Sequence, residues 1–128
     1  MIVLRLAKST SILHQPDTGT EWGEHPYPCE DGIPEHTPQH VCGALGWEKF
    51  RFWWHDTKKL RDAAETHSVY LVRIPDECVL VGKHQVMFRP EDATGIQRAS
   101  IPALLEHEAR GADLDLLIDL GVSYGYRQ

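Results

Sequence analysis

The sequence predicts an α+β fold: one domain with a mainly antiparallel sheet, a long Pro-rich N-terminal loop and three to four short helices. Three features predict it, namely a β-rich stretch over residues 68–90, a Pro-rich stretch over residues 9–44, and helical periodicity on both sides of the β-rich stretch. A chain of 128 residues is expected to form one domain with one core.

The β-rich stretch contains three apolar runs, at residues 69–74, 78–81 and 86–88, separated by Pro75 and by Gly82. Short runs of β-branched and aromatic residues with such breaks predict consecutive strands of a sheet. The first two runs are almost continuously apolar, which predicts strands covered on both faces.

An earlier strand is predicted over residues 2–7, with Arg5 as its one charged residue. One interpretation is that Arg5 points to solvent, as most arginines do. The other is that Arg5 lies at a strand end and holds an anionic group, because a planar guanidinium fits phosphate.

Residues 9–44 hold five of the eight prolines, which interrupt regular secondary structure. We expect an ordered loop across the sheet that forms the binding face, anchored by the apolar residues Trp22, Tyr27, Ile33 and Val41. The segment also carries zinc-ligand residue types, at His25, Cys29, His36, His40 and Cys42. Close Cys pairs are missing, so loop histidines and ordinary thiols are favoured over zinc.

Residues 47–67 have helical periodicity, and Asp56 is a good N-cap that divides them into two helices. This region is more aromatic than one helix face needs. Its rings either pack in the core, or Trp53 and Trp54 form a stacking wall for a flat ring such as nicotinamide or adenine.

After a turn at residues 90–95, a strand is expected over 96–101. Pro102 favours the start of a helix that ends at Gly111, and residues 112–120 predict a second helix that ends at Gly121.

The net charge of −6 argues against general nucleic-acid binding, which needs clustered Lys and Arg. A basic partner protein or a small ligand is favoured instead. The sequence has no apolar run of about 20 residues and no signal-peptide pattern, and its three cysteines fit a reducing compartment. We therefore expect a cytoplasmic protein without a membrane segment.

The elements along the chain are a strand with Arg5, a long loop, an aromatic helix, the run Val-Tyr-Leu-Val-Arg-Ile-Pro and then the run Gln-Val-Met-Phe-Arg-Pro. This order of elements resembles the small ADP-ribosyltransferase-like fold. In that family a first-strand Arg or His binds NAD, and a late strand begins with the catalytic Glu. The resemblance implies that Arg5 binds NAD and that Gln85 stands at the catalytic position, preceded by Lys83 and His84. A neutral amide supplies no negative charge, so the resemblance implies NAD or nucleotide binding with weak or no transferase activity. The alternative for Gln85 is a polar residue on the solvent face of a strand.

The chain is also similar to uncharacterised proteins of actinobacteria and their phages, in its Cys-Gly, Val-Tyr-x-Val-x-Ile-Pro and Gly-x-x-Gln-Val-x-Phe elements. This similarity is consistent with a role as an accessory protein. Two hypotheses follow. In the first, a nucleotide is bound by Arg5 at phosphate, Trp53 or Trp54 at a ring and Gln85 at ribose, with His84 as a further ligand-binding residue. In the second, an acidic phage-type protein inhibits or redirects a host factor through carboxylates at Glu106, Glu108 and Asp113. A zinc-stabilised binding module is a minor alternative.

Overall fold

The structure of the chain, a computed structural model, describes residues 1–8, 32 and 39–115. In these residues the chain forms six strands, three helices and two short 3-10 helices. In order they are β1 (Ile2–Lys8), β2 (Val41–Gly43), α1 (Trp47–Trp53), α2 (Thr57–Ala63), β3 (His67–Arg73), the 3-10 helix Asp76–Cys78, β4 (Val79–Val81), β5 (Val86–Phe88), the 3-10 helix Pro90–Asp92, β6 (Gly95–Ala99) and α3 (Ile101–Ala109).

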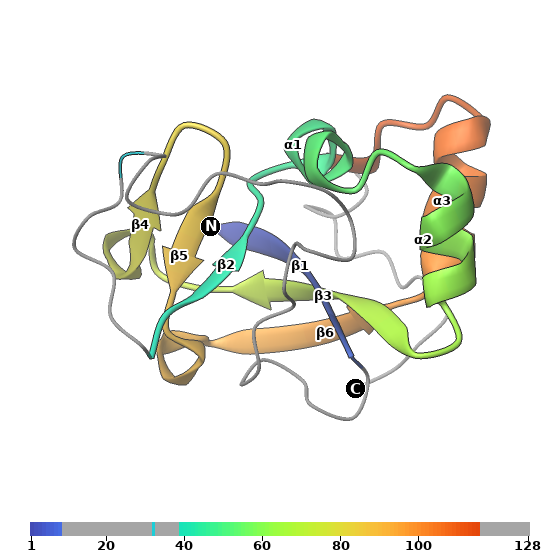
Figure 1. The fold of residues 1–128 in the computed structure, drawn as a ribbon. Helices are drawn as coiled ribbons and strands as arrows, with labels where there is room; N and C mark the ends of the chain where they lie inside the picture. The colour runs from blue at the N-terminus through green and yellow to red at the C-terminus, as the bar shows by residue number, and fades with distance from the viewer. Residues whose placement is uncertain (9–31, 33–38, 116–128) are drawn as a thin grey trace.

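The strands form two three-stranded antiparallel sheets (Figure 1). The first has the order β1-β3-β6 and the second the order β2-β5-β4. An isolated bridge joins them, in which Leu4 and Ala44 exchange backbone hydrogen bonds of 2.9 and 2.8 Å. This arrangement confirms the predicted α+β class with antiparallel pairing.

The first sheet is covered on both faces. One face packs against the helices, and the core between them is built from β1, β3, β6 and all three helices. The largest buried residues of this core include Leu4, Leu6, Phe50, Leu60 and Leu104. The other face packs in part against the second sheet, through Val3, Val72, Val86 and Phe88 among others. Figure 1 shows the second sheet at one end of the first sheet, and α2 and α3 at the other.

Gly43 makes the close approach of the two sheets possible. A Cβ atom at this position would lie 2.3 Å from Val3 Cγ1 and 3.0 Å from the Leu4 carbonyl oxygen. Real Cβ atoms essentially never lie 2.3 Å from another heavy atom, so any larger residue would displace the Val3 side chain or the strands themselves.

The helix ends follow the capping residues of the sequence. Asp56 caps α2 by accepting a 3.1 Å hydrogen bond from the Lys59 amide, as predicted. Ser100 caps α3 in the same way by accepting from the Ala103 amide, and Gly111, with a φ of 75°, follows the end of that helix.

A polar network joins α1 to α3. The Glu108 carboxylate accepts hydrogen bonds from the indole Nε1 of Trp47 at 2.6 Å and from Arg51 Nε at 3.0 Å. Asp115 accepts from the Trp47 amide at 2.8 Å and so satisfies a donor in the first turn of α1. This network holds α1 in place above the first sheet.

The structure corrects several expectations. The three runs of the β-rich stretch belong to two sheets, because β3 pairs with β1 and β6 whereas β4 pairs with β5. β4 lies at a sheet edge, and Val81 is 55% exposed, so this strand is not covered on both faces. The second helix ends at Ala63, and His67 begins β3.

Other expectations fall partly outside the described residues. The predicted loop ends in a strand, β2, and the rest of it lies outside the described residues apart from Gly32, Gln39 and His40. The helix expected over 112–120 is described only as far as Asp115. Among the described residues, no helix is long and apolar enough to cross a membrane.

Candidate functional site: a cationic row across the first sheet

One face of the first sheet carries two arginines in register. Directly paired residues of antiparallel strands point to the same face of a sheet. Arg5 of β1 pairs with Tyr70 of β3, and Tyr70 pairs with Arg98 of β6. These three side chains therefore form a row across all three strands, which we call the cationic row.

The cationic row is largely buried. Arg5 is only 2% exposed, Tyr70 is also buried, and Arg98 is half-buried. Ser68, two residues before Tyr70 and hence on the same face, is buried as well. With about 4.8 Å between neighbouring strands, the Cα atoms of the two arginines lie roughly 10 Å apart.

β2 positions the guanidinium of Arg5. Its Nη1 donates a 2.8 Å hydrogen bond to the Cys42 carbonyl oxygen and lies 3.5 Å from the Cys42 Sγ. A buried charge is costly unless it is hydrogen-bonded, and this bond meets part of that need. The side chain is thus held in one orientation beside the second sheet.

The turn between β4 and β5 carries the other predicted site residues. Gln85 is 6% exposed, and its carbonyl oxygen accepts a 2.8 Å hydrogen bond from the Gly82 amide, which closes the turn. The carbonyl oxygen of His84 accepts a 2.6 Å hydrogen bond from the indole Nε1 of Trp53. The end of α1 therefore holds this turn in place.

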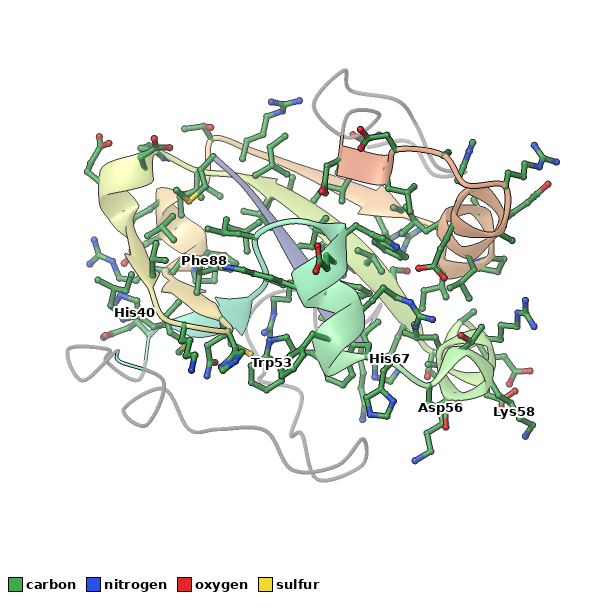
Figure 2. The ribbon with its side chains drawn as sticks, turned by 90° about the horizontal axis from the view of Figure 1, so that it is seen from above. His40, Trp53, Asp56, Lys58, His67 and Phe88 are labelled. Carbon is green, nitrogen blue, oxygen red and sulfur yellow. The ribbon has the colours of Figure 1, made fainter. Side chains whose placement is uncertain are left out.

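An exposed aromatic ring covers the same turn. Phe52 stacks on His84, with ring centroids 4.9 Å apart and 10° between the ring planes, and it meets Trp53 edge-on at 6.0 Å. Phe52 is 57% exposed, in contrast to the buried Trp53 beside it. Figure 2 shows Trp53 at the end of α1 and Phe88 in the second sheet.

These parts lie on neighbouring elements. Cys42, which accepts from Arg5, pairs with Met87 of β5, and Gly43 pairs with Val86. Gln85 immediately precedes Val86, so the turn with His84 and Gln85 leads directly into the strand beside β2. The structure therefore places Arg5 beside β2, and Trp53, His84 and Gln85 at the turn that leads into the neighbouring β5.

The structure also decides between alternatives for individual residues. Arg5 is buried, so its side chain does not face solvent, and it lies in the middle of β1 rather than at a strand end. Gln85 is buried, so the interpretation as a solvent-facing residue is wrong. Trp53 belongs to the core beneath the helices, and the half-buried Trp54 packs against it, as the core-packing interpretation predicts. Their ligand roles stay predictions.

Sequence reasoning missed Tyr70, Arg98, Ser68 and Phe52. The alternation of Ser68 and Tyr70 with Val69 and Leu71 was a usable signal, because it separates the two faces of β3. The role of Arg98 depends on the pairing register of β6, which no local pattern gives.

Of the zinc-ligand residue types, His25, Cys29 and His36 lie outside the described residues. Across residues 1–8, 32 and 39–115, no group of three or more His, Cys, Asp or Glu side chains is placed to hold a metal ion.

Residues 1–102 match the family model of the bacteriophage T4 Y00F protein. The chain belongs to this family. The matched segment includes both sheets, so the cationic row and the turn with Gln85 fall inside the matched residues. No curated protein and no solved structure matches the chain. Membership of the Y00F family confirms the phage part of the predicted similarity. The Gly-x-x-Gln-Val-x-Phe similarity to actinobacterial proteins and the resemblance to ADP-ribosyltransferases gain no match.

Proposed function

We propose that this Y00F-family protein is a phage accessory protein that binds an anionic nucleotide-type ligand, such as NAD or ADP-ribose, at the cationic row. The observation that carries the proposal is the alignment of Arg5, Tyr70 and Arg98 on one face of the first sheet. The protein as a whole has a net charge of −6. Two arginines in one row thus form a local site for anions on an acidic protein.

The chemistry of the row suits a diphosphate. A guanidinium offers a planar fork of donors that can bind phosphate oxygens in pairs. The Tyr70 hydroxyl can donate or accept between the two arginines. Electrostatic attraction is stronger at such a partly desolvated site than at an exposed one.

Gln85 suits binding better than catalysis. Its amide can hydrogen-bond a ribose hydroxyl, but it carries no negative charge to stabilise a cationic transition state. On the resemblance to ADP-ribosyltransferases, a Glu would stand at this position. We therefore propose ligand binding with weak or no transferase activity.

A thermal-shift titration with NAD, ADP-ribose and uncharged adenosine tests the proposal. A ligand that binds only the folded state raises the melting temperature with increasing concentration. We expect saturable shifts with NAD and ADP-ribose and a much smaller one with adenosine. No shift up to millimolar NAD and ADP-ribose would contradict the proposal.

Arg98→Gln and Arg73→Gln provide a matched pair for this titration. Arg98 belongs to the row, whereas Arg73 is an exposed arginine of the same sheet whose register places it on the opposite face. We expect Arg98→Gln to reduce the ligand-induced shift and Arg73→Gln to leave it unchanged.

The net charge of −6 supports a second candidate function, the binding of a basic host protein. The structure limits how it can be tested, because Glu108 is part of the network that holds α1. Charge reversal at the exposed residues Glu106 or Asp113 is the cleaner test. It should slow association with such a partner at low salt, and an unchanged association rate would contradict the idea.

A further inference from the structure

We propose that the outer face of Phe52 is the stacking surface for a flat ring of the ligand, an inference that rests on the proposed nucleotide binding. Phe52 is a large apolar side chain that is 57% exposed, at the end of α1. One face of its ring is occupied by His84, at 4.9 Å and nearly parallel. Aromatic side chains that present a face in this way are common stacking surfaces for nucleotide bases.

The ring is held before any ligand arrives. Trp53 meets Phe52 edge-on, and the Trp53 indole donates to the His84 carbonyl oxygen at 2.6 Å. Phe52 is therefore flanked by the rings of His84 and Trp53, and a hydrogen bond ties the Trp53 indole to the His84 backbone. A ring held in its binding orientation loses less conformational freedom when a ligand stacks on it.

Contacts between neighbouring elements connect the cationic row to Phe52. From the cationic row, the path runs from Arg5 through Cys42 of β2 to the neighbouring β5, and from there to Gln85, His84 and Phe52. The proposed phosphate, ribose and ring contacts at Arg5, Gln85 and Phe52 therefore lie on elements that contact one another in turn.

This assignment moves the stacking role away from the tryptophans. Trp53 is 7% exposed and belongs to the core beneath the helices, so little of its ring surface is open to a ligand. Trp54 packs half-buried against the same core. Phe52 is the aromatic residue of α1 whose side chain is mostly open.

Calorimetric titration of the full chain with NAD and with inorganic pyrophosphate tests the inference. We expect Phe52→Ala to weaken NAD binding by about 5- to 150-fold, the range for losing one stacked ring. Phe52→Trp should retain NAD binding because it keeps a ring. Pyrophosphate has no ring, so its affinity should be the same in wild type and Phe52→Ala.

Val81→Ala is the control for the loss of exposed apolar surface, because Val81 is 55% exposed and aliphatic. It should leave NAD binding unchanged. If Phe52→Ala binds NAD as tightly as wild type while Arg98→Gln binds it more weakly, the stacking role is overturned and the proposed function stands. If wild type binds neither NAD nor pyrophosphate, both are overturned.

Discussion

Two neighbouring rows on the same face of the first sheet differ in charge. Val3, Val72 and Ile96 pair across the three strands to form an apolar row. The next row on this face is the cationic row, two residues further along β1 and two residues earlier along β3. Backbone pairing is the same in both, so the difference lies only in the side chains and in what packs against them.

The second sheet explains the apolar row. Val3 and Val72 are fully buried and share a core cluster with Phe88 and Val86 of β5, and Ile96 packs against that cluster. Burial of this kind stabilises a fold. In the cationic row, Tyr70 belongs to the same cluster, but the two guanidinium groups beside it are costly to bury. A departure from the pattern that folding favours is typical of functional sites.

The largest effect is expected where the apolar row meets the second sheet. Phe88 is fully buried against this row, so Phe88→Ala should lower the free energy of unfolding by about 3–5 kcal/mol. Denaturant unfolding would measure it. The exposed Val81 offers a control on the same sheet, with an expected change within about 0.5 kcal/mol for Val81→Ala. Similar losses in the two variants would contradict this account of the apolar row.

The free energy of unfolding should be nearly as sensitive to a change at the contact between the two sheets. Gly43→Ala would place a Cβ 2.3 Å from Val3 Cγ1, and we expect a loss of about 1–3 kcal/mol from the forced displacement. Gly95→Ala is the matched control, because its nearest contact would be an ordinary 3.7 Å to Arg73 Cδ. A Gly43→Ala variant as stable as Gly95→Ala would show that the sheets can separate without cost.

In the cationic row, the effect on binding should exceed the effect on folding. Arg5→Met keeps a long side chain but leaves the Cys42 carbonyl oxygen without its charged donor, which should cost about 1–3 kcal/mol. The variant should remain folded and lose the thermal shift produced by NAD and ADP-ribose. A folded Arg5→Met protein with the full shift would remove Arg5 from the binding site.

The smallest effect is expected far from both rows, at the start of α2. The hydrogen bond from the Lys59 amide holds the pKa of Asp56 below its ordinary value of 3.8. Because the pKa of Asp56 is lowered in the folded state, its ionised side chain stabilises the protein at pH values above the ordinary pKa. This stabilisation is lost as the pH falls through the lowered pKa. Asp56→Ala should therefore reduce the melting temperature slightly at neutral pH, and the difference should vanish in strong acid. A difference that persists there would exclude the ionised cap as its cause.

Local patterns in the sequence predicted much of the fold. The first strand, the runs that became β3, β4 and β5, the Asp56 cap and the helix that ends before Gly111 all depend on neighbouring residues. The division into two sheets depends instead on contacts between distant residues, such as the bridge between Leu4 and Ala44. No periodicity within one strand reveals such a contact.

The same distinction applies to the candidate site. Arg5 was identifiable because it interrupts an apolar strand, and Gln85 because of the resemblance. Arg98 became part of the site only through its pairing with Tyr70. Phe52 could not be separated from Trp53 by sequence, because adjacent helical residues differ in burial only once the packing partners are known.

The most direct test of the cationic row is an NMR titration that follows the Nε–Hε signals of the arginine side chains as ADP-ribose is added. We predict that the signals of Arg5 and Arg98 shift together and saturate at one dissociation constant, while the signal of Arg73 on the opposite face does not move. Unchanged signals for Arg5 and Arg98 at saturating ADP-ribose, or an equal shift for Arg73, would contradict the assignment of the row as the binding site.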